Sequence, residues 1–338
     1  MARRPGSQRV GSRRRFRYLD SRGNVITDAG KLARIEALVI PPAWRDVWIS
    51  PRATAKLQAT GMDAAGRRQY LYHQDFRALQ EQAKLDRLIR FAERLPELRS
   101  VMSDHMELDT YERDRVCAVA LRLINMGWFR VGSDRYARES RTYGITTLTK
   151  RHVVVRGSRI GFEFRGKHRA LVRTQLVDPE LAEAVKELRA LRGGARLFRY
   201  SLDGEIYSLT GARLNDYVRE HLGEEFTAKD FRTWGGTLIA AVGLAERGLA
   251  GSETQAKRNV AAVMRRVAER LGNTPAVARS SYVSPGVVEQ YLDGRTIDDF
   301  RPRHLRVVGA RDIGLDREEL ALLSLLRSWR IRRVRAAA

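Results

Sequence analysis

The residue patterning changes from strand-like to helical near residue 75, and this change limits the chain to a sheet-rich part followed by a helical part. Runs of aromatic and β-branched residues are typical of strands, and turn residues mark their ends. Such runs occupy residues 16–19, 25–27, 47–50 and 69–73, with turn signals between them. We therefore predict a hairpin over 16–27 and two further strands in one small sheet domain. From residue 75 to about residue 94 the apolar residues follow a helical period instead.

The remainder of the chain has mainly helical patterning with one strand-rich stretch. Asp109 and Glu112 form a capping-box pattern ahead of an apolar helix, and Gly127 stands where that helix is expected to end. Residues 144–177 have strand character, with the run Val153-Val154-Val155 followed by an alternation of apolar and other residues over 160–165. A last apolar-striped helix is expected over 315–335, with a solvated basic end.

These patterns divide the chain into three parts and indicate an α+β fold class. Residues 1–15 are rich in Arg, Gly and Ser and are predicted to form a basic disordered arm. Residues 16–85 are predicted to form the sheet domain. Residues 86–338 are predicted to form a mainly α-helical domain with a small β-sheet or hairpin. Within it, further helices are expected to start at Thr227 and Ser252.

Arginine dominates the charge of the chain, which contains 55 arginines and eight lysines. With 63 basic and 40 acidic residues, the formal net charge is +23. Guanidinium groups bind phosphates in a bidentate manner and keep their charge. A surplus of this size indicates a polyanionic partner, for which nucleic acid is the leading candidate. A solvated, arginine-rich surface without such a partner is the alternative.

Cysteine content and hydropathy exclude several classes of protein. Cys117 is the only cysteine, so no disulfide can form within the chain, and its apolar helical surroundings predict an inert buried thiol. No apolar run has membrane-spanning length, and no apolar segment typical of a secretory signal follows the N-terminus. No zinc-ligand spacing occurs, and Asp298-Asp299 is the nearest approach to a carboxylate pair. We expect a soluble protein of a reducing cytoplasm and find no convincing cluster for a metal-dependent nuclease.

Residues 161–168 nearly match a nucleotide-binding P-loop, but His168 stands where a Ser or Thr must hold magnesium. The alternating phenylalanines inside this segment favour a β-hairpin with Lys167 at its tip. A lysine near other cations can have its pKa lowered and serve as a general acid, which arginine cannot easily do. A solvated turn lysine is the alternative.

Three basic residues are placed to act together. Arg130 follows a helix end, and Lys229 and Arg232 are spaced i, i+3 in the first turn of a predicted helix, where they share one face. Each of them alone would be interpreted as a surface charge. Their value as a candidate site lies in the combination.

A helix start and a tyrosine occur together near the C-terminus. Asn273 precedes Thr274 and Pro275, so we interpret it as an N-cap followed by a first-turn proline. Free N–H groups at helix starts attract phosphate. Tyr282 follows about 10 Å further along the helix. A phenol near a phosphate-binding helix start, in so basic a chain, indicates chemistry on a nucleic-acid backbone, although a packing tyrosine is the alternative.

Four segments, in their order and spacing, resemble the motifs of the small, poxvirus-like type IB DNA topoisomerases of the bacterial branch. They are Phe129-Arg130-Val131-Gly132-Ser133 with Thr142-Tyr143-Gly144, then Phe164-Arg165-Gly166-Lys167, Lys229-Asp230-Phe231-Arg232, and Leu271-Gly272-Asn273-Thr274-Pro275 through Ser281-Tyr282. The segments 40–44 and 69–73 are similar to the DNA-clamping domain of that family. The match covers most of the chain.

The resemblance implies an antiparallel N-terminal sheet domain and a mainly helical catalytic domain of the tyrosine recombinase/topoisomerase IB type, closing on duplex DNA. It implies a monomeric, nucleoid-associated DNA topoisomerase that relaxes supercoiled DNA without ATP or metal, through a 3′-phosphotyrosyl intermediate. The catalytic residues that it implies are Tyr282 as nucleophile, Arg130, Arg232 and Asn273 as transition-state stabilisers, and Lys167 as general acid. The DNA contacts are Lys229, Tyr70, Tyr72, Arg67 and Arg68.

The sequence departs from the family at two positions. Poxviral members carry histidine where this chain has Asn273, whose amide can donate a hydrogen bond but adds no charge. His168 replaces an acidic residue that often follows the hairpin lysine.

Two other functions remain compatible with parts of the sequence. A tyrosine recombinase uses a similar set of Arg, Lys and Tyr residues, but usually has His-x-x-Arg where this chain has Lys229-x-x-Arg232. A non-catalytic DNA-packaging protein would explain the charge and the basic arm, but it would not explain four ordered motifs.

Overall fold

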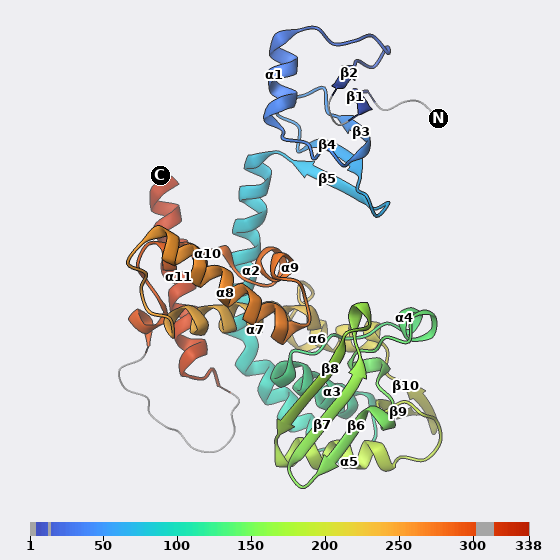
Figure 1. Ribbon diagram of the computed structural model, residues 1–338. Helices are drawn as coiled ribbons and strands as arrows, with labels where there is room; N and C mark the ends of the chain where they lie inside the picture. Colours follow the sequence, from blue (N-terminus) through green and yellow to red (C-terminus); the bar gives the residue numbers. More distant parts are fainter. Residues whose placement is uncertain (1–4, 13–14, 302–313, 338) are drawn as a thin grey trace. The chain divides into compact units, whose positions relative to one another are not determined.

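A computed structural model describes residues 5–12, 15–301 and 314–337 of the chain. The polypeptide divides into two compact units, Met1–Lys84 and Leu85–Ala338 (Figure 1). The division lies one residue before the boundary predicted from the sequence. The first unit is rich in strands and the second is mainly helical, so the predicted α+β class is confirmed.

The first unit is built on an antiparallel sheet in the order β2-β1-β3-β4-β5. Its elements are β1 (Ser7–Ser12), β2 (Arg15–Leu19), α1 (Ala29–Ala37), β3 (Arg45–Ile49), β4 (Leu57–Met62) and β5 (Arg68–Tyr72). The Asp28 side chain accepts a hydrogen bond from the backbone N–H of Lys31 and so caps α1. Ile35 of this helix packs with Val47, Ile49 and Ala59 to form a small core.

The prediction of a disordered arm over residues 1–15 is wrong for residues 7–12, which form β1. This strand pairs with β2 on one side and with β3 on the other, so both of its edges are hydrogen-bonded. The side chain of Arg9 is buried and donates to the backbone carbonyls of Ile40, Pro41 and Trp44. These long-range contacts stabilise a segment whose composition alone is typical of disorder. Residues 1–4 and 13–14 lie outside the described residues.

The hairpin predicted over 16–27 is present only in part. The turn forms, but its second arm contributes a single bridge between Leu19 and Val25 and one hydrogen bond from Ile26. The strand over residues 15–19 instead pairs along its length with β1. The strands predicted around residues 47–50 and 69–73 are confirmed as β3 and β5.

The second unit combines helices with two small antiparallel sheets. Its helices are α2 (Gln74–Met106, which starts in the first unit), α3 (Arg113–Gly127), α4 (Asp134–Glu139), α5 (Pro179–Ala190), α6 (Gly211–Leu222), α7 (Ala228–Ala245), α8 (Glu253–Leu271), α9 (Pro275–Ser281), α10 (Pro285–Leu292) and α11 (Arg317–Ala337). Its strands are β6 (Val153–Arg156), β7 (Arg159–Arg165) and β8 (Leu171–Val177), in the order β6-β7-β8, and the separate pair β9 (Arg199–Leu202) and β10 (Glu205–Ser208). Short 3₁₀ turns are η1 (Ile145–Thr147), η2 (Lys150–His152), η3 (Lys167–Arg169) and η4 (Ile297–Phe300).

The core of the second unit surrounds α3, which packs against α5, α6 and α7 and also contacts β8 and β9. Every residue from Val116 to Leu121 is buried, because neighbours cover this helix on several sides. The thiol of Cys117 is fully buried, and burial raises its pKa to about 12. This agrees with the expected inert thiol.

Helix boundaries follow the sequence signals in some places and not in others. Thr227 and Asp230 form the expected capping box of α7, and Ser252 caps α8. By contrast, Glu112 makes no side-chain capping bond at the start of α3, so the expected Asp109–Glu112 box does not form. Helix α2 continues past residue 94 and through Pro96, because Leu95 before this proline and Leu98 after it are buried in the core. In the described part of the chain, no helix is long and apolar enough to cross a bilayer.

Candidate active site

The backbone around Arg130 is fixed where the chain leaves α3. The carbonyl of Arg130 accepts a hydrogen bond from Ile145 N at 2.8 Å, and Val131 O accepts one from Thr146 N at 2.8 Å. Gly144 allows this close approach, because a Cβ there would lie only 2.6 Å from Arg130 O. Backbone hydrogen bonds to η1 therefore fix the position of Arg130, independently of the contacts that its side chain makes.

The guanidinium of Arg130 reaches the loop between α8 and α9. One of its nitrogens donates to the backbone carbonyl of Gly272 at 2.9 Å and also to the side-chain Oδ1 of Asn273. The other amide atom of Asn273, Nδ2, is buried and has no partner among the described residues. The Oδ1 atom of Asn273 therefore accepts a hydrogen bond from Arg130, while its Nδ2 group remains available as a donor beside that cation.

The expected role of Asn273 as a helix N-cap is wrong. The N-cap of α9 is Thr274, whose hydroxyl accepts a hydrogen bond from Val277 N at 3.3 Å. Pro275 takes the first helical position, where a missing N–H costs nothing, so the residue directly before it must be the cap. Asn273 precedes the cap, and its side chain is free to face Arg130.

Arg232 is a buried cation in the first turn and a half of α7. Its side chain is 4% exposed and donates to the backbone carbonyls of Trp128 and of Leu271, the latter at 2.7 Å. Its Nε atom has no partner among the described residues. Burial, together with the charge of Arg130, lowers the pKa of Arg232 to about 10.

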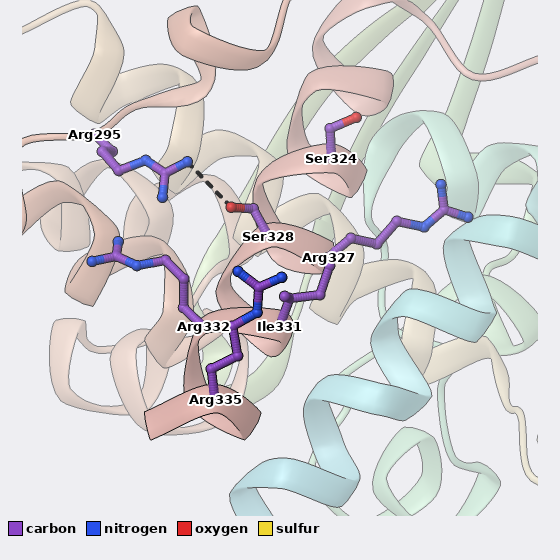
Figure 2. Close-up of a pocket in the computed structure, with 7 residues that line it drawn as sticks. All are labelled: Arg295, Ser324, Arg327, Ser328, Ile331, Arg332 and Arg335. Atoms are coloured by element: carbon purple, nitrogen blue, oxygen red, sulfur yellow. Dashed lines mark hydrogen bonds between the residues drawn. The ribbon is translucent and has the colours of Figure 1, made fainter. Parts of the chain in front are cut away.

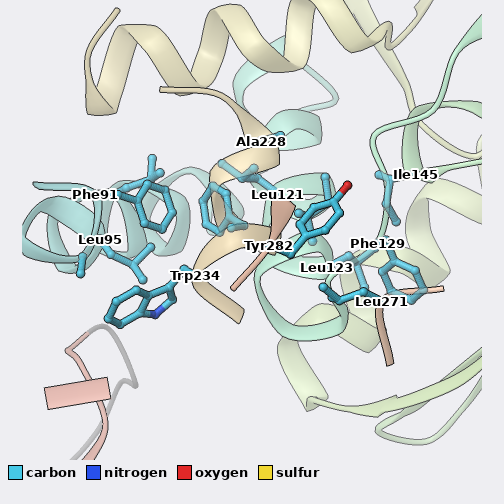
Figure 3. Packing of buried hydrophobic residues seen from close by; sticks show 14 of the residues in the cluster. Phe91, Leu95, Leu121, Leu123, Phe129, Ile145, Ala228, Trp234, Leu271 and Tyr282 are labelled. Atoms are coloured by element: carbon cyan, nitrogen blue, oxygen red, sulfur yellow. The ribbon is translucent and has the colours of Figure 1, made fainter. Parts of the chain in front are cut away.

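Tyr282 lies at the C-terminal end of α9 and is 8% exposed (Figure 3). Its backbone carbonyl accepts a hydrogen bond from the Thr237 hydroxyl at 3.2 Å, which ties it to α7. The guanidinium carbon of Arg232 lies 5.1 Å from the centre of the phenol ring. Tyr282 is therefore held against the helix that carries this buried arginine.

Opposing effects act on the Tyr282 phenol. Burial raises its pKa, whereas the positive charges of Arg232 and Arg130 lower it, and the net result is a pKa below the ordinary tyrosine value. The cations therefore stabilise the phenolate more than burial disfavours it. A lowered pKa of this kind activates an oxygen nucleophile.

Lys167 lies at the turn between β7 and β8, as the sequence predicts, and it is exposed. The two residues after it, His168 and Arg169, have positive φ angles of 59°, which the short turn between these strands requires. Lys167, Arg130 and Arg232 all line one open cleft of about 950 Å³. Within the described residues, the Lys167 ammonium makes no hydrogen bond or ion pair, so it is free to act on a molecule in the cleft.

Lys229 precedes Arg232 by one turn, and its ammonium lies 5.9 Å from the centre of the Tyr282 ring. The predicted sharing of one helix face by these two basic residues agrees with this geometry. Lys229 is exposed, in contrast to Arg232. The structure thus brings Arg130, Arg232, Asn273 and Tyr282 together, with the two lysines at the borders of the group.

The remaining predicted DNA contacts belong to the first unit. Arg68, Tyr70 and Tyr72 alternate along β5 and are exposed on one face of the sheet. The two tyrosine rings are stacked, with centroids 6.3 Å apart. Arg67 lies in the turn before this strand and forms an ion pair with Asp63 at 2.8 Å.

Sequence reasoning missed three residues that shape the site. Trp128 ends α3 in the left-handed conformation, with φ of 51°, which directs its carbonyl to Arg232. A Cβ at Gly235 would collide with the Trp128 indole, and a Cβ at Gly236 would lie 2.8 Å from Tyr282 O. The adjacent glycines inside an otherwise apolar helix were the available signal, because glycine there weakens a helix and marks close packing.

The described residues contain no group of three or more His, Cys, Asp or Glu side chains that could hold a metal ion.

Two family models match separate parts of this chain. One, described as eukaryotic DNA topoisomerase I, catalytic core, matches residues 73–295. The other, described as bacterial DNA topoisomerase IB, N-terminal domain, matches residues 15–63. The first match includes Arg130, Lys167, Lys229, Arg232, Asn273 and Tyr282.

Curated viral proteins are similar over most of the chain. DNA topoisomerase 1B of Acanthamoeba polyphaga mimivirus is 32% identical over 284 residues, which is 82% of this chain and 84% of the viral protein. DNA topoisomerase 1B of Vaccinia virus (strain Copenhagen) is 22% identical over 254 residues, covering 73% of this chain and 76% of its own. A solved structure of the XerH site-specific recombinase with palindromic difH substrate, a post-cleavage complex, aligns with a TM-score of 0.36 at 16% identity, covering 55% of this chain and 47% of the recombinase chain.

Proposed function

The chain belongs to the type IB DNA topoisomerase family, and on that premise we propose that it relaxes supercoiled duplex DNA by breaking and rejoining one strand through Tyr282. The observation that carries the proposal is the contact of this phenol with a buried arginine whose Nε has no partner in the described chain. A second unused donor, Asn273 Nδ2, lies beside Arg130. Buried donors without partners are costly unless a ligand completes them.

The proposed chemistry is transfer of a phosphoryl group from a DNA oxygen to tyrosine. The Tyr282 oxygen forms a bond to the phosphorus of a backbone phosphodiester, its proton is released to solvent, and the bond from phosphorus to the 5′-oxygen breaks. Arg130, Arg232 and Asn273 Nδ2 donate to the phosphate oxygens and stabilise the negative charge that develops there. The strand is left with a 3′-phosphotyrosyl bond and a free 5′-hydroxyl.

Lys167 is proposed as the acid that protonates the departing 5′-oxygen. It lines the same cleft as the two arginines, and its ammonium has no competing acceptor in the described chain. Lys229 is proposed to bind a neighbouring phosphate or to assist in this proton transfer. Religation is the reverse reaction, and because the covalent bond retains the energy of the broken one, the proposal requires no ATP.

The remaining features of the proposal concern how DNA is held. The exposed face of β5 with Tyr70, Tyr72 and Arg68, and the neighbouring Arg67, is proposed to contact the duplex. We propose that the enzyme acts as a monomer on nucleoid DNA, because one chain supplies every residue assigned to the chemistry.

The decisive experiment measures relaxation of a negatively supercoiled plasmid in the presence of a chelator and without nucleotide. The expected result is relaxation by the natural protein and a DNA adduct that survives denaturation. Tyr282→Phe is expected to bind DNA without forming any adduct, because it lacks the attacking oxygen. An adduct of normal yield in this variant would contradict the assignment of the nucleophile.

The same assay distinguishes the two other functions considered. A plasmid without a recombination site is not a substrate for a site-specific recombinase, so its relaxation excludes that function. A packaging protein would bind the plasmid and form no covalent adduct.

A further inference from the structure

A second basic hollow lies along the C-terminal helix α11 (Figure 2). It is a shallow, open depression of about 440 Å³, lined by Arg295, Ser324, Arg327, Ser328, Ile331, Arg332 and Arg335. None of these residues lines the cleft that contains Arg130 and Lys167. The chemistry proposed above therefore leaves this hollow without a role.

All the charged residues that line the hollow are positive. Four of its lining residues are arginines and none is acidic. Arg327 is held by Glu93 at 2.6 Å, and Arg332 lies between Gln290 Oε1 at 3.2 Å and Asp293 at 3.4 Å. These partners fix two guanidiniums beside the hollow without supplying a carboxylate to its wall.

The other two arginines have unused capacity. Among the described residues, neither Arg295 nor Arg335 forms an ion pair with a carboxylate. Arg295 donates to the Ser328 hydroxyl at 3.2 Å, and its guanidinium lies 5.0 Å from the centre of the Phe300 ring. Four arginine cations with only two carboxylate partners leave a local surplus that an anion would balance.

Helix stabilisation explains only Arg335, which lies in the last turn of α11. Arginines near a helix C-terminus interact favourably with the helix dipole, but only within the last turn. Arg327 is ten residues before the end of α11, and Arg295 comes from the turn after α10. Ser324 and Ser328, one turn apart on α11, provide short side chains that keep the hollow open and hydroxyls that can donate to a phosphate oxygen.

We propose that this hollow binds the phosphate backbone of DNA outside the catalytic cleft. Arg327 and Arg335 are eight residues apart on one helix, or about 12 Å along its axis. That length matches about three to four steps of a DNA strand, so several phosphates can be contacted together. The inference rests on the proposed function in one respect, namely that DNA is the substrate. The phosphates belong either to the flank of the cleaved duplex or to a second duplex.

The test compares two double variants. Arg295→Gln with Arg335→Gln removes the two uncommitted guanidiniums. Arg330→Gln with Arg333→Gln removes two charges from the same helix at positions that do not line the hollow; Arg333 covers the Trp329 ring and Arg330 lies 3.8 Å from Asp86. Thermal unfolding and the single-turnover cleavage rate of a short duplex show, for each variant, that the fold and the cleft are intact.

One arm of the experiment tests the flank. In a Tyr282→Phe background, which needs no cleavage, the affinity for a long duplex is compared with that for a short duplex over a range of salt concentrations. The hollow variant is expected to lose the advantage of the long duplex, with a salt slope smaller by about 0.9 for each lost phosphate contact. The control variant is expected to keep both.

The other arm tests a second duplex. Cleavage close to the 3′ end of one strand of a short duplex releases a small fragment that bears the free 5′-hydroxyl and leaves the protein covalently attached, with its cleft occupied. Binding of a labelled second duplex to this adduct is then measured. Loss of affinity in the hollow variant alone, in either arm, supports the proposal.

Unchanged affinity in both arms, or equal losses in the hollow and control variants, would overturn it, since the effect would then be absent or due to net charge alone. If the natural protein forms no covalent adduct with DNA, the proposed function is contradicted. The affinity measurements with the Tyr282→Phe protein still test the hollow in that case, because they do not depend on cleavage.

Discussion

At the scale of single residues, the chemistry of Tyr282 depends on a balance between burial and charge. Burial raises the pKa of the phenol, and Arg232 followed by Arg130 lowers it below the ordinary value of 10. Cleavage is therefore expected to become faster as the pH rises and to level off below pH 10, because the phenolate is the better nucleophile.

Removing a cation should change this profile in a defined direction. In Arg232→Ala the loss of positive charge raises the pKa of Tyr282, so the rising limb should move to higher pH. The cleavage rate at neutral pH should also fall by about 10²–10³-fold, as for loss of a transition-state donor. The measurement is the single-turnover rate against pH, with Arg130→Ala expected to give a smaller shift. If the cleavage rate falls but the rising part of its pH profile stays at the same pH, Arg232 does not control the pKa of Tyr282.

Lys167 can be tested by changing the leaving group instead of the protein alone. Lys167→Ala should slow cleavage of ordinary DNA, because the 5′-oxygen then leaves without a proton. A substrate with a better leaving group at the 5′ position needs no such proton and should recover most of the rate. The comparison is between the two substrates in single-turnover cleavage, with Arg173→Ala, another residue of the cleft, as control. Equal slowing on both substrates would contradict a role as general acid.

The identity of the site residues could be predicted from sequence, but their surroundings could not. Arg130, Lys167, Arg232 and Tyr282 occur in short motifs that a resemblance can identify. The burial of Arg232 and its bonds to the Trp128 and Leu271 carbonyls depend on packing between distant segments. The interpretation of Asn273 as an N-cap was wrong by one residue. Pro275 takes the first helical position of α9, so the cap is Thr274 and Asn273 lies before it.

At the scale of elements, the close contact between the end of α3 and the middle of α7 positions the buried arginine. Trp128 in its left-handed conformation directs its carbonyl to Arg232, while its indole fills the space that the missing side chain of Gly235 provides. A bulky residue with positive φ is strained, and such strain often occurs at functional sites.

A double-mutant cycle tests this contact. Gly235→Ala should collide with the indole, displace Trp128 and slow cleavage, with an overpacking cost of about 1–3 kcal/mol. Trp128→Gly keeps the backbone conformation and the carbonyl, so adding it to Gly235→Ala should restore part of the cleavage rate. Trp128→Ala should restore less, because alanine disfavours positive φ.

The control is Gly243→Ala on the same helix, where a Cβ would lie 3.3 Å from a Val263 methyl group that can shift. Additive effects of the two substitutions in the cycle would show that the contact does not position Arg232.

Sequence patterning identified many elements but missed others, among them short helices such as α1 and strands that depend on pairing. Strand β4 has the sequence Leu-Gln-Ala-Thr-Gly-Met, whose small and polar residues are a weak strand signal, and its backbone is paired with β3 on one side and β5 on the other. β1 was missed for the same reason. Both strands owe their stability to neighbours that no local pattern records.

At the scale of the whole molecule, the chemistry and the proposed DNA contacts around β5 are assigned to different compact units. Every residue proposed for phosphoryl transfer lies in Leu85–Ala338, whereas Tyr70, Tyr72, Arg67 and Arg68 lie in Met1–Lys84. Substitutions in the first unit should therefore weaken DNA binding without changing the cleavage rate at saturating DNA. Substitutions of the residues proposed for phosphoryl transfer should do the reverse.

Arg68→Gln provides the cleanest test of this division, because Arg67 already forms an ion pair with Asp63, whereas Arg68 has no ion pair among the described residues. If Arg68 contacts one phosphate, its loss should reduce the slope of log affinity against log salt by about 0.9 and leave the saturated cleavage rate unchanged. Arg22→Gln, an equal loss of charge in the exposed turn after β2, is the matched control. An equal change in both variants would show that net charge, and not the face of β5, attracts the duplex. A fall in the saturated cleavage rate of Arg68→Gln would instead show that the first unit takes part in the chemical step.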